Sequence, residues 1–202
     1  MAPEQNLSFE RIAHDYDETR GGLRRGRRFA ETIAGHLTTS DVVVEVGVGT
    51  GLVALPLVEL GHRLAGFDIS PAMLHLAAER VPGVIGLGDT ACLPVRTGSV
   101  DAIVAVWALN VVGDRHAMAS ELARALRPGG TLLTVSPTPD VDGDDIHEAT
   151  AGLSPGLGIS PGVDRSDELA PFLAPHGFSF VSDEVTDEFH LEQTPNERAD
   201  QY

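Results

Sequence analysis

Three glycines that alternate with other residues directly after an apolar run constrain the fold of this chain more than any other feature. Residues 42–52 read VVVEVGVGTGL, in which Val42–Val46 is typical of a buried strand. Gly47, Gly49 and Gly51 then lead into a segment with the periodicity of a helix. Glycine exposes the backbone to a ligand, and the first N–H groups of a helix have no partners within the helix. The stretch therefore predicts a strand–loop–helix turn with a ligand at the loop.

Strand-like and helix-like segments alternate from this stretch onward. Strands are expected at residues 42–46, 62–67, 83–87, 100–106 and 131–136, and helices at 51–60, 71–80 and 121–126. Ser70 and Pro71 mark the start of one helix, as an N-cap followed by proline at the first helical position. Such alternation predicts a parallel sheet with helices on both faces.

Further elements are expected on either side of this core. Two helices precede the sheet, at residues 7–19 and 23–38, and a helix at 166–174 follows it. Two strands at 178–184 and 188–193 lie close enough to form an antiparallel hairpin. The sequence thus predicts an α/β, Rossmann-like, doubly wound fold, with N-terminal cap helices and a mostly parallel seven-stranded sheet that ends in this hairpin.

Length and composition indicate a single domain over residues 1–202. Hydrophobic residues make up 42% and charged residues 22%, the ordinary balance of a globular chain with a sizeable core. We expect the cap helices in residues 1–40, a cofactor-binding core in 41–136, and the substrate side with the hairpin in 137–202.

The net charge and the single cysteine limit which binding partners and which cellular compartment are expected. The net charge of −16 repels polyanions, so no nucleic-acid partner is expected. No apolar run approaches the roughly 20 residues of a membrane span, and residues 1–18 lack a secretory signal. The single Cys92, expected to be a small core thiol, fits a reducing cytoplasm. The basic patch Arg24–Arg28 is interpreted as a solvated helix face, with anion binding or substrate gating as the alternatives.

The glycine loop alone fits two ligands. Gly49–Ala54 satisfies the G-x-G-x-x-A pattern of dinucleotide sites, and Asp68 lies 19 residues after Gly49, near the spacing expected for a ribose-binding acid. S-adenosylmethionine fits the same loop, because its methionine end also needs a close backbone. The loop therefore does not distinguish a nicotinamide dinucleotide from S-adenosylmethionine.

Acidic residues at three strand ends favour S-adenosylmethionine. Glu45 precedes the glycines, where a carboxylate suits an ammonium group and disfavours a pyrophosphate. Asp68 ends the second expected strand and can accept from two ribose hydroxyls. Asp89 follows the third strand and can accept from an adenine amine. Together they form an acidic rim at the carboxyl edge of the sheet, where open α/β sheets bind ligands.

Five segments in order carry a resemblance to a known family. They read FERIAHDYDETR, VVVEVGVGTGLVALPL, GFDISPAMLHLAAER, GDTACLPVRTGSVDAIVAVWALNVV and ELARALRPGGTLLTVS, within residues 9–195. In their order and spacing the chain resembles the class I S-adenosylmethionine-dependent methyltransferases, in particular small bacterial ones that act on small molecules. The resemblance implies S-adenosyl-L-methionine as cofactor and a small-molecule methyl acceptor.

The resemblance also implies a role for individual residues. The methionine part would be held by Glu45 and the backbone of Gly47, Gly49 and Gly51, the ribose by Asp68, and the adenine by Ile69, Met73, Asp89 and Thr90. Trp107 would lie near the reactive methyl group, and Tyr16 and Arg20 would close over the cofactor.

Catalytic residues are less clearly marked. Many relatives have a histidine where this chain has Asn110, and an amide cannot deprotonate a substrate. Asn110 is therefore expected to orient the substrate, with a structural role as the alternative. His147 is the preferred general base, although an acceptor that is already ionised needs none. The acidic stretch 140–145 departs from a calcium loop in its glycine and its final ligand, so no metal is expected.

Three functions stay open at this point. The first is transfer of a methyl group to an oxygen, nitrogen or carbon atom of a small molecule, in bacterial secondary metabolism. The alternatives are an NAD(P)-linked oxidoreductase that uses the same loop, and a non-catalytic cofactor-binding module. The acceptor and the oligomeric state do not follow from the sequence.

Overall fold

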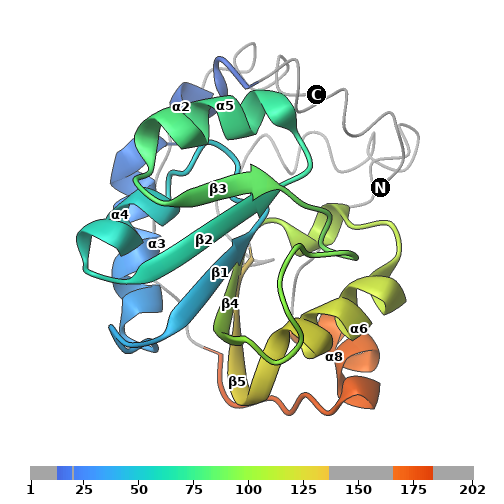
Figure 1. Cartoon of the computed structure of the whole chain (residues 1–202). Helices are drawn as coiled ribbons and strands as arrows, with labels where there is room; N and C mark the ends of the chain where they lie inside the picture. Colours follow the sequence, from blue (N-terminus) through green and yellow to red (C-terminus); the bar gives the residue numbers. More distant parts are fainter. Residues whose placement is uncertain (1–12, 20, 137–165, 184–202) are drawn as a thin grey trace, which may run out of the picture.

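The protein is built on a parallel five-stranded sheet with helices on both faces (Figure 1). The computed structural model describes residues 13–19, 21–136 and 166–183. Its strands are β1 (Val42–Val46), β2 (Arg63–Asp68), β3 (Val84–Leu87), β4 (Val100–Val106) and β5 (Leu126–Val135), in the spatial order β3-β2-β1-β4-β5. The order reverses at β1, so the carboxyl ends of β1 and β4 flank the switch point where doubly wound sheets bind ligands.

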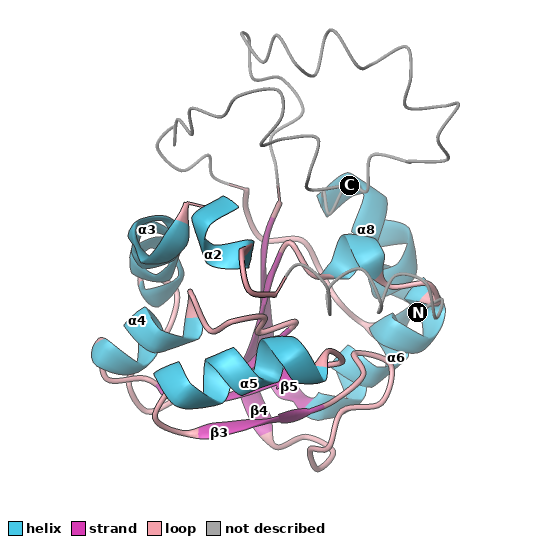
Figure 2. Cartoon of the chain, turned by 90° about the horizontal axis from the view of Figure 1, so that it is seen from above, coloured by secondary structure: helices cyan, strands magenta, loops and turns pink. Residues whose placement is uncertain are grey.

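The helices divide between the two faces of the sheet. They are α2 (Tyr16–Thr19), α3 (Gly22–Ala34), α4 (Ala54–Glu59), α5 (Pro71–Arg80), α6 (Arg115–Ala125) and α8 (Ser166–Leu173), with short 3-10 turns at Leu109–Val111 and Ala174–His176. Figure 2 shows α3 and α4 on one side of the sheet and α6 and α8 on the other. The expected doubly wound arrangement is confirmed.

Strand side chains alternate between two hydrophobic clusters. In β1, Val44 and Val46 pack with Met118 of α6, whereas Val43 packs with Leu57 of α4. Successive side chains of a strand point to opposite faces. Glu45 therefore points from β1 toward the face that carries α3 and α4, where it replaces an apolar side chain of the core.

Several expected boundaries differ from the structure for local reasons. α6 begins at Arg115, well before residue 121, because the Asp114 carboxylate caps it by accepting from Ala117 N at 2.9 Å. β5 already begins at Leu126, and residues 127–130 bulge out opposite Asp101. α3 ends at Ala34 rather than at residue 38.

The C-terminal hairpin is only partly covered by the described residues. Residues 178–183 form no strand, contrary to the expectation for 178–184, and residues 188–193 lie outside the described part. All five strands that the structure describes are parallel, so a seven-stranded sheet and the division into three segments stay predictions.

Two surface features complete the fold. Cys92 is exposed, so its assignment as a core thiol is wrong: Cys92 N donates to Asp89 O at 2.8 Å in a tight turn, and the neighbouring Leu93 enters the core instead. In the described ranges, no helix is long and apolar enough to cross a membrane.

Candidate cofactor site

The glycine loop is held in place by the end of β2. Gly47 N and Val48 N donate to Phe67 O at 2.8 and 3.1 Å, and Gly49 N donates to the Asp68 Oδ2 atom at 2.8 Å. The other oxygen, Oδ1, accepts from Ser70 N at 2.9 Å. Asp68 thus fixes the loop as well as lying at the strand end expected for a ribose contact.

The three glycines serve different purposes. All have left-handed backbone, with φ of 67° at Gly47, 54° at Gly49 and 82° at Gly51. A Cβ at Gly47 would lie 2.5 Å from the Ala108 side chain, and one at Gly51 would lie 2.6 Å from Val81. A Cβ at Gly49 would meet nothing within 4 Å. Of the three, only Gly49 faces open space, whereas packing against Ala108 and Val81 already requires glycine at positions 47 and 51. Contact of their backbone with a ligand stays a prediction.

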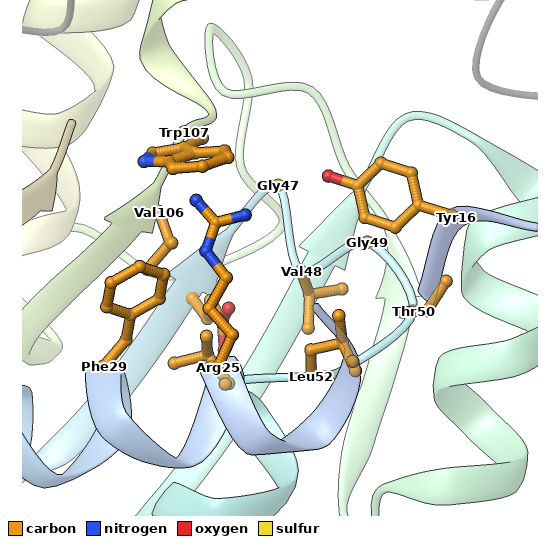
Figure 3. Close-up of a pocket in the computed structure, with 14 residues that line it drawn as sticks. Tyr16, Arg25, Phe29, Gly47, Val48, Gly49, Thr50, Leu52, Val106 and Trp107 are labelled. Atoms are coloured by element: carbon orange, nitrogen blue, oxygen red, sulfur yellow. The ribbon is translucent and has the colours of Figure 1, made fainter. Parts of the chain in front are cut away.

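A cavity of about 500 Å³, partly open to solvent, lies between this loop, β1, β4 and α3 (Figure 3). Five of the residues predicted for the site line it, namely Tyr16, Glu45, Gly47, Gly49 and Trp107. Residues from the N-terminal helices, the first strand and the fourth strand are therefore brought together as the sequence predicted.

Glu45 lines this cavity although it is almost completely buried. The residue is 2% exposed, and its Oε2 atom accepts no hydrogen bond from the described residues. Burial, with a further contribution from the charge of Asp68, raises the pKa of Glu45 to about 8. A buried carboxylate without a partner is costly. A cationic group bound in the cavity would supply the missing partner.

Trp107 closes the cavity at the carboxyl end of β4. Its φ of 52° is rare for a non-glycine residue, and its buried Nε1 atom has no hydrogen-bond partner among the described residues. Backbone strain of this kind concentrates at functional sites. Trp107 thus lines the cavity, and its position beside the reactive methyl group stays a prediction.

Arg25 and Phe29 of α3 also line the cavity, and sequence reasoning missed both. The Arg25 guanidinium carbon lies 3.4 Å from the Trp107 ring centroid and 5.2 Å from that of Phe29. Figure 3 shows the guanidinium directly beneath the indole. The basic patch that contains Arg25 was interpreted as a solvated face, but neighbouring residues of a helix point in different directions. Arg24 and Arg28 are exposed, whereas Arg25 is half-buried and lines the cavity.

The residues predicted to bind the adenosine lie outside the cavity. Asp68, Ile69 and Thr90 are half-buried, and Met73 is 2% exposed. The Asp89 carboxylate accepts from Ala91 N at 2.9 Å and so stabilises its own turn. Their roles toward ribose and adenine stay predictions.

Three further predictions concern side chains outside the described part of the chain. Arg20 and His147 lie outside the described residues, as does the acidic stretch 140–145. Asn110 lies in the 3-10 turn that follows β4, and its side chain is outside the described part. Among the described residues, no group of three or more His, Cys, Asp or Glu side chains could hold a metal ion.

Comparison with known proteins agrees with this geometry. Residues 44–134 match the family model described as "Methyltransferase domain". A demethylmenaquinone methyltransferase of Tropheryma whipplei is 34% identical over 136 residues, which cover 62% of this chain and 55% of the relative. The chain thus spans about half the length of such curated relatives.

Solved structures share the fold. A methyltransferase in complex with the Trm112 methyltransferase activator of Haloferax volcanii superimposes with a TM-score of 0.71 at 24% identity, over 91% of this chain and 82% of the other. The [4+2]-cyclase SpnF superimposes with a TM-score of 0.68 at 19% identity, over 88% and 73%. At these identities the likeness establishes the fold alone. Together with the family match over β1–β5, it shows that this chain carries a class I S-adenosylmethionine-dependent methyltransferase domain.

Proposed function

We propose that the protein transfers the methyl group of S-adenosylmethionine to an oxygen, nitrogen or carbon atom of a small molecule. The observation that carries this proposal is Glu45, a buried carboxylate that lines the cavity and has an oxygen without a hydrogen-bond partner among the described residues. The family match supplies the cofactor class. A role in bacterial secondary metabolism is the narrower form of the proposal and rests on the sequence resemblance.

The charges in the cavity fit the methionine end of the cofactor. Among the described residues that line it, Glu45 and Arg25 are the charged side chains. An amino-acid end carries one ammonium and one carboxylate group, so it needs one anion and one cation. We assign Glu45 to the ammonium group and Arg25 to the carboxylate, because guanidinium binds planar carboxylates with two parallel hydrogen bonds.

The remaining lining residues position the reactants and exclude water. S-adenosylmethionine supplies an electrophilic methyl group on a sulfonium, together with its leaving group. Trp107, Val106 and Phe29 provide apolar walls beside the loop. Alignment of an acceptor in such a cavity lowers the barrier by holding the reacting atoms close together. Nothing in this step requires a base from the chain when the acceptor arrives ionised.

The oxidoreductase alternative fits the cavity less well. A pyrophosphate at the glycine loop would lie near Glu45, and ionisation of that carboxylate would repel it. The SpnF match raises a different question, because a protein titled a [4+2]-cyclase has the same fold. Cofactor binding and methyl transfer therefore need separate measurements.

Calorimetry with S-adenosylhomocysteine and with NADH tests the cofactor. We expect micromolar binding of S-adenosylhomocysteine and none of NADH. Glu45→Gln should weaken binding at least about tenfold, since it removes the one acidic side chain among the described residues that line the cavity. Glu31→Gln, on the exposed face of α3, is the matched control and should leave affinity unchanged.

Transfer is tested with radiolabelled S-adenosylmethionine and a panel of phenols, enols, amines and carboxylates. A labelled product confirms the proposal. Tight cofactor binding without transfer to any acceptor class would support the non-catalytic module instead. Binding of NADH with no binding of S-adenosylhomocysteine would overturn the assignment.

A further inference from the structure

Three charged or polar side chains from separate elements meet beside the glycine loop. The Asp17 carboxylate of α2 accepts from the Thr50 hydroxyl through Oδ1 and forms an ion pair with Arg80 through Oδ2. Arg80, the last residue of α5, also donates through Nη1 to Thr50 O at 2.8 Å and to Thr50 Oγ1 at 3.2 Å. We call Asp17, Thr50 and Arg80 the latch.

The latch lies next to the cavity and is well shielded. Thr50 is 1% exposed and lies between Gly49 and Gly51, so the latch contacts the glycine loop directly. The side chains of Asp17 and Arg80 are 27% and 23% exposed. The single Thr50 hydroxyl proton goes to Asp17 while its oxygen accepts from Arg80, so its hydrogen bonds fix the orientation of the group.

The helix that carries Asp17 needs such an anchor. α2 spans only Tyr16–Thr19, one turn, and a helix of that length is not stable by itself in water. Its first residue, Tyr16, lines the cavity next to Thr50. Figure 3 shows the Tyr16 hydroxyl turned toward the Trp107 side of the cavity. The position of Tyr16 therefore depends on the residue that follows it.

We propose that Asp17 is a positioning residue whose latch with Thr50 and Arg80 holds Tyr16 over the bound cofactor and slows its release. Asp17 does not touch the cofactor in this arrangement, since it acts through Tyr16 and the loop. The latch joins α2 to the glycine loop that follows β1 and to α5, which follows β2. The position of α2 over the cavity and the conformation of the glycine loop therefore depend on each other. The role in cofactor release rests on the proposed function, whereas the anchoring of α2 does not.

Dissociation kinetics of S-adenosylhomocysteine test the latch. Stopped-flow fluorescence of Trp107, the sole tryptophan, gives the release rate directly. Asp17→Asn and Thr50→Val should each speed release at least about tenfold, since each breaks a charge-assisted contact. Thr50→Ser keeps the hydroxyl and should change the rate less than about twofold. Equal release rates for wild type, Asp17→Asn and Thr50→Val would overturn the proposal.

A second experiment separates the latch from general destabilisation. Exchange of the charges, Asp17→Arg with Arg80→Asp, should restore slow release relative to either single variant. A merely structural role would lower the melting temperature in the single variants without changing the release rate from the folded protein, and that result also overturns the proposal.

Failure of the proposed function can be told apart from failure of the latch. If wild type binds no S-adenosylhomocysteine, the function is wrong, and the latch is then measured by limited trypsin digestion. All 14 basic residues are arginines, and Arg20 is the cleavage site between α2 and α3. Asp17→Asn should increase the rate of cleavage after Arg20 at least about fivefold over wild type. Equal cleavage rates would overturn the latch.

Discussion

At the scale of single residues, Glu45 links the stability of the protein to pH. Its pKa of about 8 in the folded protein lies above the ordinary value of 4.5, so the folded state holds the proton more tightly than the unfolded state. The resulting stabilisation is fully present below about pH 4.5 and is lost as the pH rises toward 8. The carboxyl group therefore lowers the stability of the ligand-free protein near neutral pH.

Replacement of Glu45 by glutamine should remove this dependence. We expect Glu45→Gln to be more stable than wild type at pH 8 by at least about 1 kcal/mol, and the difference to shrink toward pH 5. Urea unfolding at pH 5, 6, 7 and 8 measures it. A variant that is less stable than wild type at pH 8 would contradict the unpartnered state of Glu45.

Substitutions at Gly47 and Gly49 should separate an effect on protein stability from an effect on cofactor binding. Gly47→Ala places a methyl group 2.5 Å from the Ala108 side chain at a φ of 67°, so it should lower stability by about 2 kcal/mol or more. Gly49→Ala meets no neighbour, so it should cost only about 1 kcal/mol of backbone strain but should block the cofactor. Thermal melts and calorimetry with S-adenosylhomocysteine test both. Equal effects of the two variants on stability would contradict the distinction.

These residues also show where sequence reasoning on the site ends. Glu45 and Gly49 could be predicted because a strand end and a helix start impose where their backbone lies. Tyr16 and Trp107 were implied only by the resemblance to the methyltransferase family. Arg25 could not, because its contact depends on how α3 packs against β4, which a local pattern does not encode. The latch was missed for the same reason: its acid and its guanidinium are 63 residues apart.

At the scale of elements, α3 is held against the cofactor loop by a glycine. Gly26 is buried inside α3, and a Cβ there would lie 2.0 Å from Leu52 O, a backbone atom that cannot move aside cheaply. Glycine in a helix interior ordinarily costs stability relative to alanine. Its presence between four arginines is thus explained by close packing rather than by helix propensity.

Gly26→Ala should therefore destabilise the protein although alanine is the better helix former. We expect a loss of about 2 kcal/mol or more and weaker binding of S-adenosylhomocysteine, because α3 also carries Arg25 and Phe29. Glu31→Ala, on the exposed face of the same helix, should have little effect. A melting temperature at or above that of wild type would show that α3 is not docked as the structure has it.

The core elements were predictable, but several of their ends were not. Alternation of apolar runs and helical segments located all five strands, most clearly the central strands β1 and β4, which are buried on both faces. The observed boundaries differ from the expected ones where a side chain caps an element, as Asp114 caps the start of α6. Residues 178–183 have a strand-like pattern but form no strand, because strand formation requires a paired neighbour that composition does not supply.

At the scale of the whole molecule, the acidic charge should favour the methyl donor over its product. The chain has a net charge of −16, and its described cavity lies in that field. S-adenosylmethionine carries a net positive charge at pH 7, since its sulfonium adds to a zwitterionic amino-acid end, whereas S-adenosylhomocysteine is neutral overall. A surface field raises the association rate of an oppositely charged ligand and is screened by salt.

The association rates of the two ligands should therefore respond differently to salt. Between low salt and about 0.5 M NaCl, where screening acts within a few ångströms, we expect the rate for S-adenosylmethionine to fall at least about twofold. The rate for S-adenosylhomocysteine should change much less, which makes the product an internal control for any effect of salt on the latch or on the fold. Stopped-flow measurements on one protein sample give both rates. Parallel salt dependences would mean that the acidic surface is too far from the cavity entrance to steer the donor, and that the selectivity of the site is confined to Glu45 and its immediate neighbours.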